Sequence, residues 1–269
     1  PLAEALTSRP AVSPDCQWAT FVRNHDELTL DKLSGSEREE VFAAFGPDES
    51  MQLFGRGLRR RLPSMIDGDE RVLRMIYSLA FSLPGTPVLF YGEEIGMAEN
   101  LEIEGRMSVR APMQWSGERH GGFSTAARAR DLCRPVLEDG RFGAQEVNVW
   151  RQRRDEGSLL NWFERLIRRR RECPELGFGT LEVLDPGSPS VLAHRCDWQG
   201  STVLALHELS GRKATARLTL DEPDDAETLV DLFGDDELSV APGEPFDLDL
   251  RPYDHRWFRV RRKGHRLAP

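Results

Sequence analysis

The chain has 269 residues, 39% of them hydrophobic and 30% charged, and a formal net charge of −9 at pH 7. This length allows one large domain or two ordinary ones. The acidic balance argues against a nucleic-acid partner, because proteins that bind nucleic acid are normally basic. No apolar run approaches the ~18 residues of a membrane span, so we expect no membrane partner.

The cysteines are scattered along the chain without a CxxC pair, at Cys16, Cys133, Cys173 and Cys196. This spacing predicts neither a metal site nor a disulfide framework. Free thiols in a protein of the reducing cytoplasm are the simplest interpretation. The first residue is Pro1 and no signal-peptide pattern follows it. We therefore expect the chain to begin inside a longer protein, by processing or by truncation.

An apolar-rich run over residues 17–22 predicts a short strand that leads into Asn24-His25-Asp26. In a parallel (β/α) barrel, the carboxyl end of such a strand is where ligands bind. A carboxylate beside an imidazole can hold a pair of vicinal hydroxyl groups there. The alternative is a turn in which Asp26 caps the next segment and His25 packs against it. The triplet alone leaves both interpretations open.

Two helices are predicted in the next part of the chain. The first covers residues 36–45, where Ser36 and Glu39 fit a capping box. The second covers residues 69–83, with Asp69 as N-cap and apolar residues at helical spacing. Between them, residues 59–61 form an arginine cluster. Solvated side chains or ion pairs with local acids are favoured there over a phosphate site.

A continuous apolar run over residues 86–92 follows the second helix and predicts a strand buried on both faces. The order strand, helix, strand, with ~60 residues between the strands, indicates a right-handed parallel crossover. Residues 92–157 then form a long region rich in Gly, Asn, Pro and Arg, as functional loops often are. A last strong helix is predicted over residues 158–173, with Ser158 as its cap.

From about Gly179 the sequence changes to short alternating runs separated by Gly, Pro and Asp turns, which is typical of a small antiparallel β-sandwich. The predicted strands are residues 191–194, 202–207, 214–220, 228–232, 246–250 and 256–260. We predict domains at 1–177 and 178–262, with a tail at 263–269. Trp198 and Trp257 are either exposed aromatics that bind glucan or core residues of the sandwich, and the core is favoured.

Three stretches together resemble the α-amylase superfamily, glycoside hydrolase family 13: FVRNHD at 21–26, PGTPVLFYGEEIG at 84–96 and GRMSVRAPMQW at 105–115. The resemblance is greatest to its trehalose synthase and oligo-α-glucosidase branch. It implies an α/β plus all-β fold, namely the C-terminal part of a (β/α)8 TIM barrel followed by an antiparallel β-sandwich domain. Residues 17–24 and 87–91 would be the seventh and eighth barrel strands.

The family breaks glycosidic bonds with retention, using a nucleophile Asp and an acid/base Glu ~5 Å apart. The resemblance implies that both lie on earlier strands, which would precede this chain. The resemblance makes Asp26 the third carboxylate, which binds the hydroxyls at C2 and C3 of the transferred glucose, and makes His25 a ligand of the same sugar. Arg110 either lines the aglycone side or forms a buried ion pair that anchors its loop, and both remain open. Ala111 stands where Thr is more usual.

Glu93 and Glu94 are not expected to be the catalytic pair, because neighbours on a strand point to opposite faces. The family position favours a structural ion pair for Glu94. The resemblance implies no cofactor for this chain, and a structural calcium would belong to loops in the preceding part.

We expect the chain to be part of a retaining glycosidase or transglycosidase. The expected reaction is the isomerisation of maltose to trehalose. Its partners would be maltose, trehalose or short α-glucans, together with the preceding barrel segment. The alternatives are hydrolysis by an α-glucosidase or α-amylase, or a non-catalytic carbohydrate-binding module. On this interpretation the isolated chain is an inactive fragment.

Overall fold

The computed structural model describes residues 2–10, 12–13, 15–220 and 226–262, so the predicted tail at 263–269 lies outside the described residues. The chain forms two compact units. The first comprises Pro1–Thr20, Arg74–Pro87 and Leu166–Pro269, and the second comprises Phe21–Leu73 and Val88–Arg165. The domain limits drawn from the sequence stay a prediction. In the described part of the chain, no helix has the length and apolar character needed to cross a membrane.

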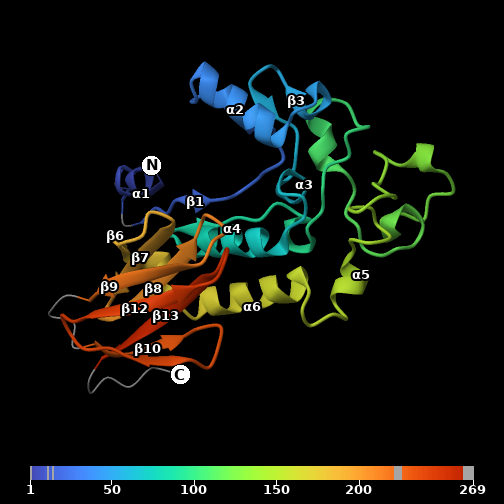
Figure 1. Cartoon of the computed structure of the whole chain (residues 1–269). Coiled ribbons are helices and arrows are strands. Elements are labelled where there is room, and N and C mark those ends of the chain that lie inside the picture. Colours follow the sequence, from blue (N-terminus) through green and yellow to red (C-terminus); the bar gives the residue numbers. More distant parts are fainter. Residues whose placement is uncertain (1, 11, 14, 221–225, 263–269) are drawn as a thin grey trace. The chain divides into compact units, whose positions relative to one another are not determined.

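The first unit contains a six-stranded antiparallel sheet in the order β11-β10-β13-β8-β7-β6 and a two-stranded sheet of β9 and β12. Figure 1 shows these strands in orange and red. The large sheet consists of β6 (Thr180–Leu184), β7 (Val191–Trp198), β8 (Ser201–Glu208), β10 (Ala226–Asp231), β11 (Glu237–Ser239) and β13 (His255–Arg262). The small sheet consists of β9 (Ala214–Thr219) and β12 (Pro245–Leu250).

Alternation of buried and exposed residues builds the core between these two sheets. On β9, Ala216 and Leu218 are buried while their neighbours are exposed. They share one apolar cluster with Leu204 of β8, Leu250 of β12 and Phe258 of β13. This arrangement confirms the predicted sandwich, since a period of two buries one face of each strand. All six predicted segments are strands, and the structure adds β6 and β11, which the sequence reading missed.

Helix α4 (Glu70–Ser82) packs its C-terminal half on the sandwich. The Asp69 carboxylate accepts a hydrogen bond of 2.9 Å from the Arg71 backbone N–H, as expected of an N-cap. At the other end, Ser78 Oγ accepts the indole N–H of Trp257 at 3.0 Å. Trp257 is fully buried, so a role as an exposed glucan-binding residue is wrong. Trp198 is half-buried and packs on Phe178, with ring centroids 5.5 Å apart.

The remaining helices of the first unit are short, or belong to it only in part. They are α1 (Leu2–Thr7), α7 (Pro174–Phe178) and the C-terminal half of α6 (Leu159–Arg171). As predicted, Ser158 caps α6, because its hydroxyl accepts the Asn161 backbone N–H at 3.3 Å.

All four cysteines are free thiols, with Cys173 and Cys196 buried.

The two predicted barrel strands form a parallel pair, with Ala19 opposite Thr86 and Thr20 opposite Pro87. Both are shorter than expected, since β1 covers Ala19–Thr20 and β5 covers Thr86–Pro87. The prediction that residues 86–92 are buried on both faces is wrong, because Val88 is 46% exposed. Among the described residues β5 pairs with β1 alone, and two strands cannot close a barrel or cover each other's faces.

The second unit begins with the Asp26 turn and a small three-stranded sheet, in which β4 (Gly57–Leu58) lies between β2 (Leu28–Thr29) and β3 (Gln52–Leu53). Helix α2 (Gly35–Phe45) has a capping box, but it is made by Ser34 and Glu37. The predicted box at Ser36 and Glu39 is therefore wrong by two residues, since both pairs fit the same pattern and the helix begins at the earlier one.

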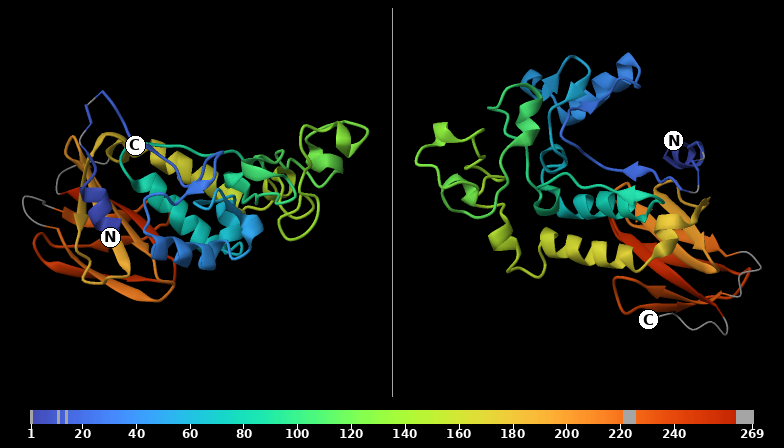
Figure 2. Two further views of the ribbon diagram at one scale, coloured as in Figure 1. Left: turned by 90° about the horizontal axis from the view of Figure 1, so that it is seen from above. Right: turned by 180° about the vertical axis from the view of Figure 1, so that it is seen from behind.

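Residues 92–157 carry only short elements, as Figure 2 shows for the green and yellow-green part of the ribbon. The short helices of the second unit are α3 (Leu62–Met65), α5 (Val149–Gln152) and the 3-10 turns η1 (Glu49–Met51), η2 (Glu93–Ile95), η3 (Gly105–Arg110), η4 (Arg119–Gly122) and η5 (Ala129–Asp131). A cluster of Ile95, Met97, Met113 and Val149 gives this long region its own apolar core.

Candidate functional site

The Asp26 carboxylate lies at the centre of a small charged cluster in the second unit. Asn24 Oδ1 accepts the Asp26 backbone N–H at 2.8 Å and so fixes the turn that presents the side chain. Asp26 Oδ1 accepts hydrogen bonds from Arg106 Nη1 at 3.0 Å and from Arg110 Nη2 at 2.9 Å. Asp26 Oδ2 lies 3.3 Å from His25 Nε2. The Asp26 side chain is 35% exposed, so it is accessible to a ligand.

Arg110 joins the carboxylate to the neighbouring backbone. Its Nε donates to the His25 carbonyl at 2.7 Å while its Nη2 binds Asp26. The structure therefore brings together the three residues singled out in the sequence, His25, Asp26 and Arg110. Of the two interpretations of Arg110, the ion pair is the one the structure shows, although a quarter of the side chain is exposed rather than buried.

Arg106 also belongs to the cluster, although the sequence did not predict it. It lies on η3, four residues before Arg110, and its Nη2 is 3.1 Å from Oε2 of Glu27. Glu27 is almost fully buried, whereas Asp26 is half-buried. Arg106 thus connects a fixed buried anion to the accessible one. No local pattern gave a signal for Arg106, because η3 is a 3-10 helix, in which residues three apart rather than four share one side.

The segment after β5 also contributes a neighbour to the cluster. The rings of His25 and Phe90 lie 6.5 Å apart in a tilted arrangement. Glu93 Oε2 accepts the Phe90 backbone N–H at 2.8 Å, so this carboxylate closes its own turn. Burial raises the pKa of Glu94, which is opposed by backbone hydrogen bonds from its own turn and by the positive charge of Arg61. The contact with Phe90 gives Glu93 a structural role, whereas the structural ion pair expected for Glu94 stays a prediction.

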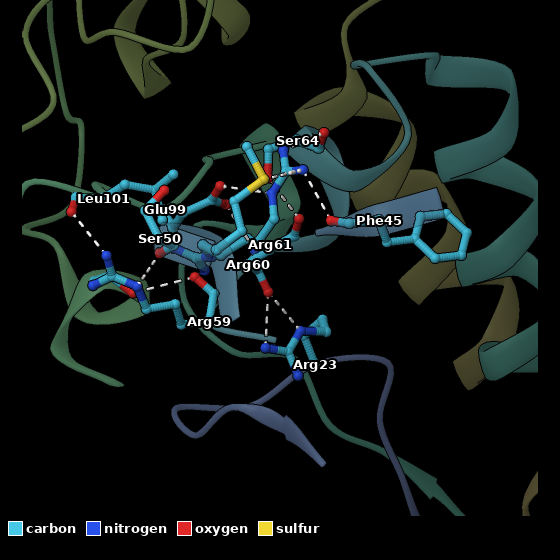
Figure 3. A network of polar contacts seen from close by, with 11 residues as sticks. Arg23, Phe45, Ser50, Arg59, Arg60, Arg61, Ser64, Glu99 and Leu101 are labelled. Carbon is cyan, nitrogen blue, oxygen red and sulfur yellow. Dashed lines mark hydrogen bonds and ion pairs between the residues drawn. The ribbon is translucent and has the colours of Figure 1, made fainter. Parts of the chain in front are cut away.

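The arginines at 59–61 form a network of polar contacts with neighbouring loops, which Figure 3 shows. Arg60 pairs with Glu99 at 3.1 Å and donates to the Phe45 carbonyl at 3.0 Å. Arg59 donates to the Ile103 carbonyl at 2.7 Å, just before η3. The expected ion pair with a local acid is confirmed for Arg60. The expectation of solvated side chains is wrong, because Arg59 and Arg61 are buried and used to bind backbone carbonyls.

Arg23 connects this arginine scaffold to the turn that carries Asp26. The Arg60 carbonyl accepts from Arg23 Nε at 3.0 Å and from Nη2 at 2.8 Å (Figure 3). The same Nη2 donates to the Asp26 carbonyl at 3.1 Å. The backbone of the Asp26 turn is therefore held from one side by Asn24 and from the other by Arg23, which leaves the carboxylate pre-oriented.

The cluster can bind a polyol, because one oxygen of the Asp26 carboxylate can accept hydrogen bonds from hydroxyl groups. Oδ1 already accepts two charge-assisted hydrogen bonds, whereas the contact of Oδ2 is with the exposed imidazole of His25. Among the described residues no group of three or more His, Cys, Asp or Glu is arranged to hold a metal ion. The arrangement is suited to hydrogen bonding of a neutral, hydroxyl-rich ligand.

Comparison with protein families gives two consecutive matches. Residues 53–179 match the family described as alpha amylase, catalytic domain. Residues 200–259 match the family described as sucrose hydrolase-like, C-terminal domain, and they correspond to β8 through most of β13.

Curated relatives cover almost the whole chain. The trehalose synthase of Pimelobacter sp. (strain R48) is 35% identical over 264 residues, which is 97% of this chain and 46% of that protein. The trehalose synthase/amylase TreS of Mycobacterium tuberculosis (strain H37Rv) is 36% identical over 263 residues, or 97% of this chain and 43% of that protein. The chain thus spans less than half the length of these relatives.

A solved structure supports the fold alone. The alpha-amylase from H. orenii superimposes with a TM-score of 0.60 at 21% identity, covering 90% of this chain and 40% of that chain.

Proposed function

The chain belongs to the α-amylase superfamily, and from this premise we propose that it is part of a retaining enzyme that acts on α-glucosides. Asp26 is the carboxylate that holds the sugar ring at the reaction centre. The observation that supports this role is its geometry: a partly exposed carboxylate that Arg106 and Arg110 orient within the second unit.

In this proposal Asp26 Oδ2 accepts hydrogen bonds from the hydroxyl groups at C2 and C3 of the transferred glucose, and His25 binds the same ring. The contacts tighten as positive charge develops on the ring, so they stabilise the transition state more than the ground state. The nucleophile and the acid/base, which must lie about 5 Å apart in a retaining enzyme, are assigned to other segments of the full-length protein.

The reaction proposed is the isomerisation of maltose to trehalose by internal glucosyl transfer. Two of the relatives that cover 97% of the chain are named trehalose synthase and trehalose synthase/amylase, which supports this choice. Hydrolysis of maltose, trehalose or short α-glucans is the second candidate, because a glucosyl-enzyme serves both outcomes and the exclusion of water decides between them. The burial of Trp257 speaks against a non-catalytic glucan-binding module built on that residue.

The test is Asp26→Asn in the full-length protein. The amide keeps the shape of the side chain and removes the charge, so we expect kcat on maltose to fall by at least about 10²-fold. The far-ultraviolet circular dichroism should not change. The matched control is Asp131→Asn, since Asp131 is a comparably exposed carboxylate that pairs with Arg128. Normal turnover by Asp26→Asn would remove Asp26 from the mechanism.

A further inference from the structure

The exposed ring of Phe54 lies beside the Asp26 cluster on a turn that does not favour a phenylalanine. Phe54 is 63% exposed, and it joins β3 to β4 together with Gly55 and Arg56. Both residues have positive φ, at 55° and 60°, and the Arg56 backbone N–H donates to the Leu53 carbonyl at 3.2 Å. Two consecutive residues of this kind make the type of hairpin turn in which Asn-Gly is preferred.

A bulky residue in the left-handed region costs on the order of 1–2 kcal/mol. Burial does not offset that cost here, because most of the Phe54 ring faces solvent. Strain of this kind persists where the side chain has a use. The turn therefore points to a function for the ring itself.

The hairpin is fixed to the backbone that carries the carboxylate. Strand β2 starts two residues after Asp26, and its Leu28 lies opposite Leu58 of β4. The Leu30 backbone N–H donates to the Arg56 carbonyl at 2.8 Å. A Cβ on Gly57 would come within 2.8 Å of the Leu28 carbonyl, which shows how closely the two segments approach. The position of Phe54 is thereby set relative to Asp26.

Two guanidinium groups hold the ring. The Cζ atom of Arg106 lies 5.8 Å from the Phe54 centroid and that of Arg56 lies 5.9 Å from it. Arg106 is the side chain that ion-pairs with Asp26 at 3.0 Å. A single arginine, Arg106, therefore lies between the exposed Phe54 ring and the carboxylate of the candidate site, and cation–π attraction restrains the ring.

We propose that Phe54 is the stacking platform for the second sugar ring, the glucose that accepts or leaves during transfer. This inference rests on the proposed function and assigns the residue that recognises the acceptor. The C–H face of a pyranose carries small positive partial charges, which complement the negative face of an aromatic ring. With Asp26 holding the first ring, Phe54 holds the second in place while the glucosyl group changes position.

The test uses Phe54→Asn in the full-length protein with two substrates. Maltose carries a second ring, whereas α-D-glucosyl fluoride carries the glucosyl ring alone. We expect kcat/KM for maltose to fall by about 5- to 10-fold, and fluoride release to stay within about 2-fold of the parent. Because Asn-Gly is the preferred turn sequence, the thermal midpoint should be unchanged or higher, so a loss of activity cannot be ascribed to unfolding.

Two further variants sharpen the comparison. Phe54→Tyr keeps the aromatic face and should match the parent on both substrates. Phe123→Asn changes a phenylalanine that is 44% exposed elsewhere in the same unit, and it should leave both rates unchanged.

The outcomes separate the two proposals. An unchanged kcat/KM for maltose in Phe54→Asn, with an active parent, overturns the role of Phe54 alone. Equal losses on both substrates also overturn it, because they place the residue in general support of the site rather than at the second ring. A parent with no turnover of either substrate overturns the proposed function and this inference with it.

Discussion

At the scale of single residues, the two oxygens of Asp26 have different environments. Oδ1 accepts hydrogen bonds from Arg106 at 3.0 Å and from Arg110 at 2.9 Å. Oδ2 has the imidazole of His25 as its neighbour. The arginines therefore set the orientation of the carboxylate, and in the proposed function Oδ2 is the oxygen that a sugar hydroxyl would contact.

Arg106 should therefore act as a positioning residue. Arg106→Lys keeps the positive charge but removes the planar guanidinium group, whose two Nη atoms contact Asp26 and Glu27 at the same time. We expect kcat on maltose to fall by about 10-fold in the full-length protein, and by more in Arg106→Met, with KM changed less than kcat. Steady-state kinetics on the parent and both variants measure this split.

The control for Arg106 is Arg128→Met, which removes an exposed arginine that pairs with Asp131 on the same unit. It should leave kcat and KM as in the parent, since exposed pairs contribute little. A fall in thermal stability in Arg106→Lys that accounts for the whole loss of activity would contradict a positioning role. So would equal kcat values in the lysine and methionine variants.

At the scale of elements, a buried histidine pair connects α4 to the sandwich. The rings of His194 and His207 stack 5.9 Å apart. His207 Nε2 lies 3.0 Å from Ser78 Oγ, and His194 Nε2 lies 3.1 Å from the Ser82 carbonyl. Burial lowers the pKa of His194 to about 4 and holds that of His207 well below its ordinary value. Both imidazoles are therefore neutral in the folded chain at neutral pH.

This depression makes the sandwich sensitive to acid. In the unfolded chain a histidine titrates near 6.5, so between about pH 6.5 and 4 the unfolded state binds protons that the folded state does not. The stability that His194 contributes is complete above about pH 6.5 and is lost as the pH falls towards about 4. The loss should be about 3 kcal/mol for this residue. Urea unfolding of the 269-residue chain from pH 4.5 to 7.5, followed by near-ultraviolet circular dichroism, measures it.

His194→Gln separates this titration from general acid effects. The glutamine amide can still donate to the Ser82 carbonyl but does not titrate. The variant is expected to be somewhat less stable than the parent at pH 7 and to lose less stability on acidification. Parallel pH profiles for the two proteins would show that His194 does not cause the acid sensitivity.

The elements that sequence could predict are those with a strong local period. Helix α4 and strands β7 and β8 were predicted because each has a long apolar pattern and flanking turn residues. β11 has three residues, and β6 follows α7 after a single glycine, so neither has a distinct pattern. The lengths of β1 and β5 depend on neighbouring strands rather than on their own residues, which is why both were predicted too long.

At the scale of the whole molecule, the candidate site was predictable only where a motif carried it. His25, Asp26 and Arg110 belong to stretches that resemble a family. Arg106 and Phe54 are recognised by their distances to one another and to Asp26, because a three-stranded sheet and η3 bring together residues that are far apart in sequence. No local pattern specifies those contacts.

The last prediction concerns the 269-residue chain by itself. Breaking a glycosidic bond with retention needs two carboxyl groups about 5 Å apart, one of them able to donate a proton. The neighbour of Asp26, Glu27, is buried and ion-paired with Arg106, so it is not placed to act as that acid. We expect the purified chain to release neither glucose from maltose nor nitrophenol from 4-nitrophenyl α-glucoside above the rate in buffer. The same chain carrying Asp26→Asn is the control for contaminating glucosidase. Turnover by the parent that disappears in this variant would show that the chain itself contains the catalytic pair, and would move the nucleophile and the acid/base into the residues described here.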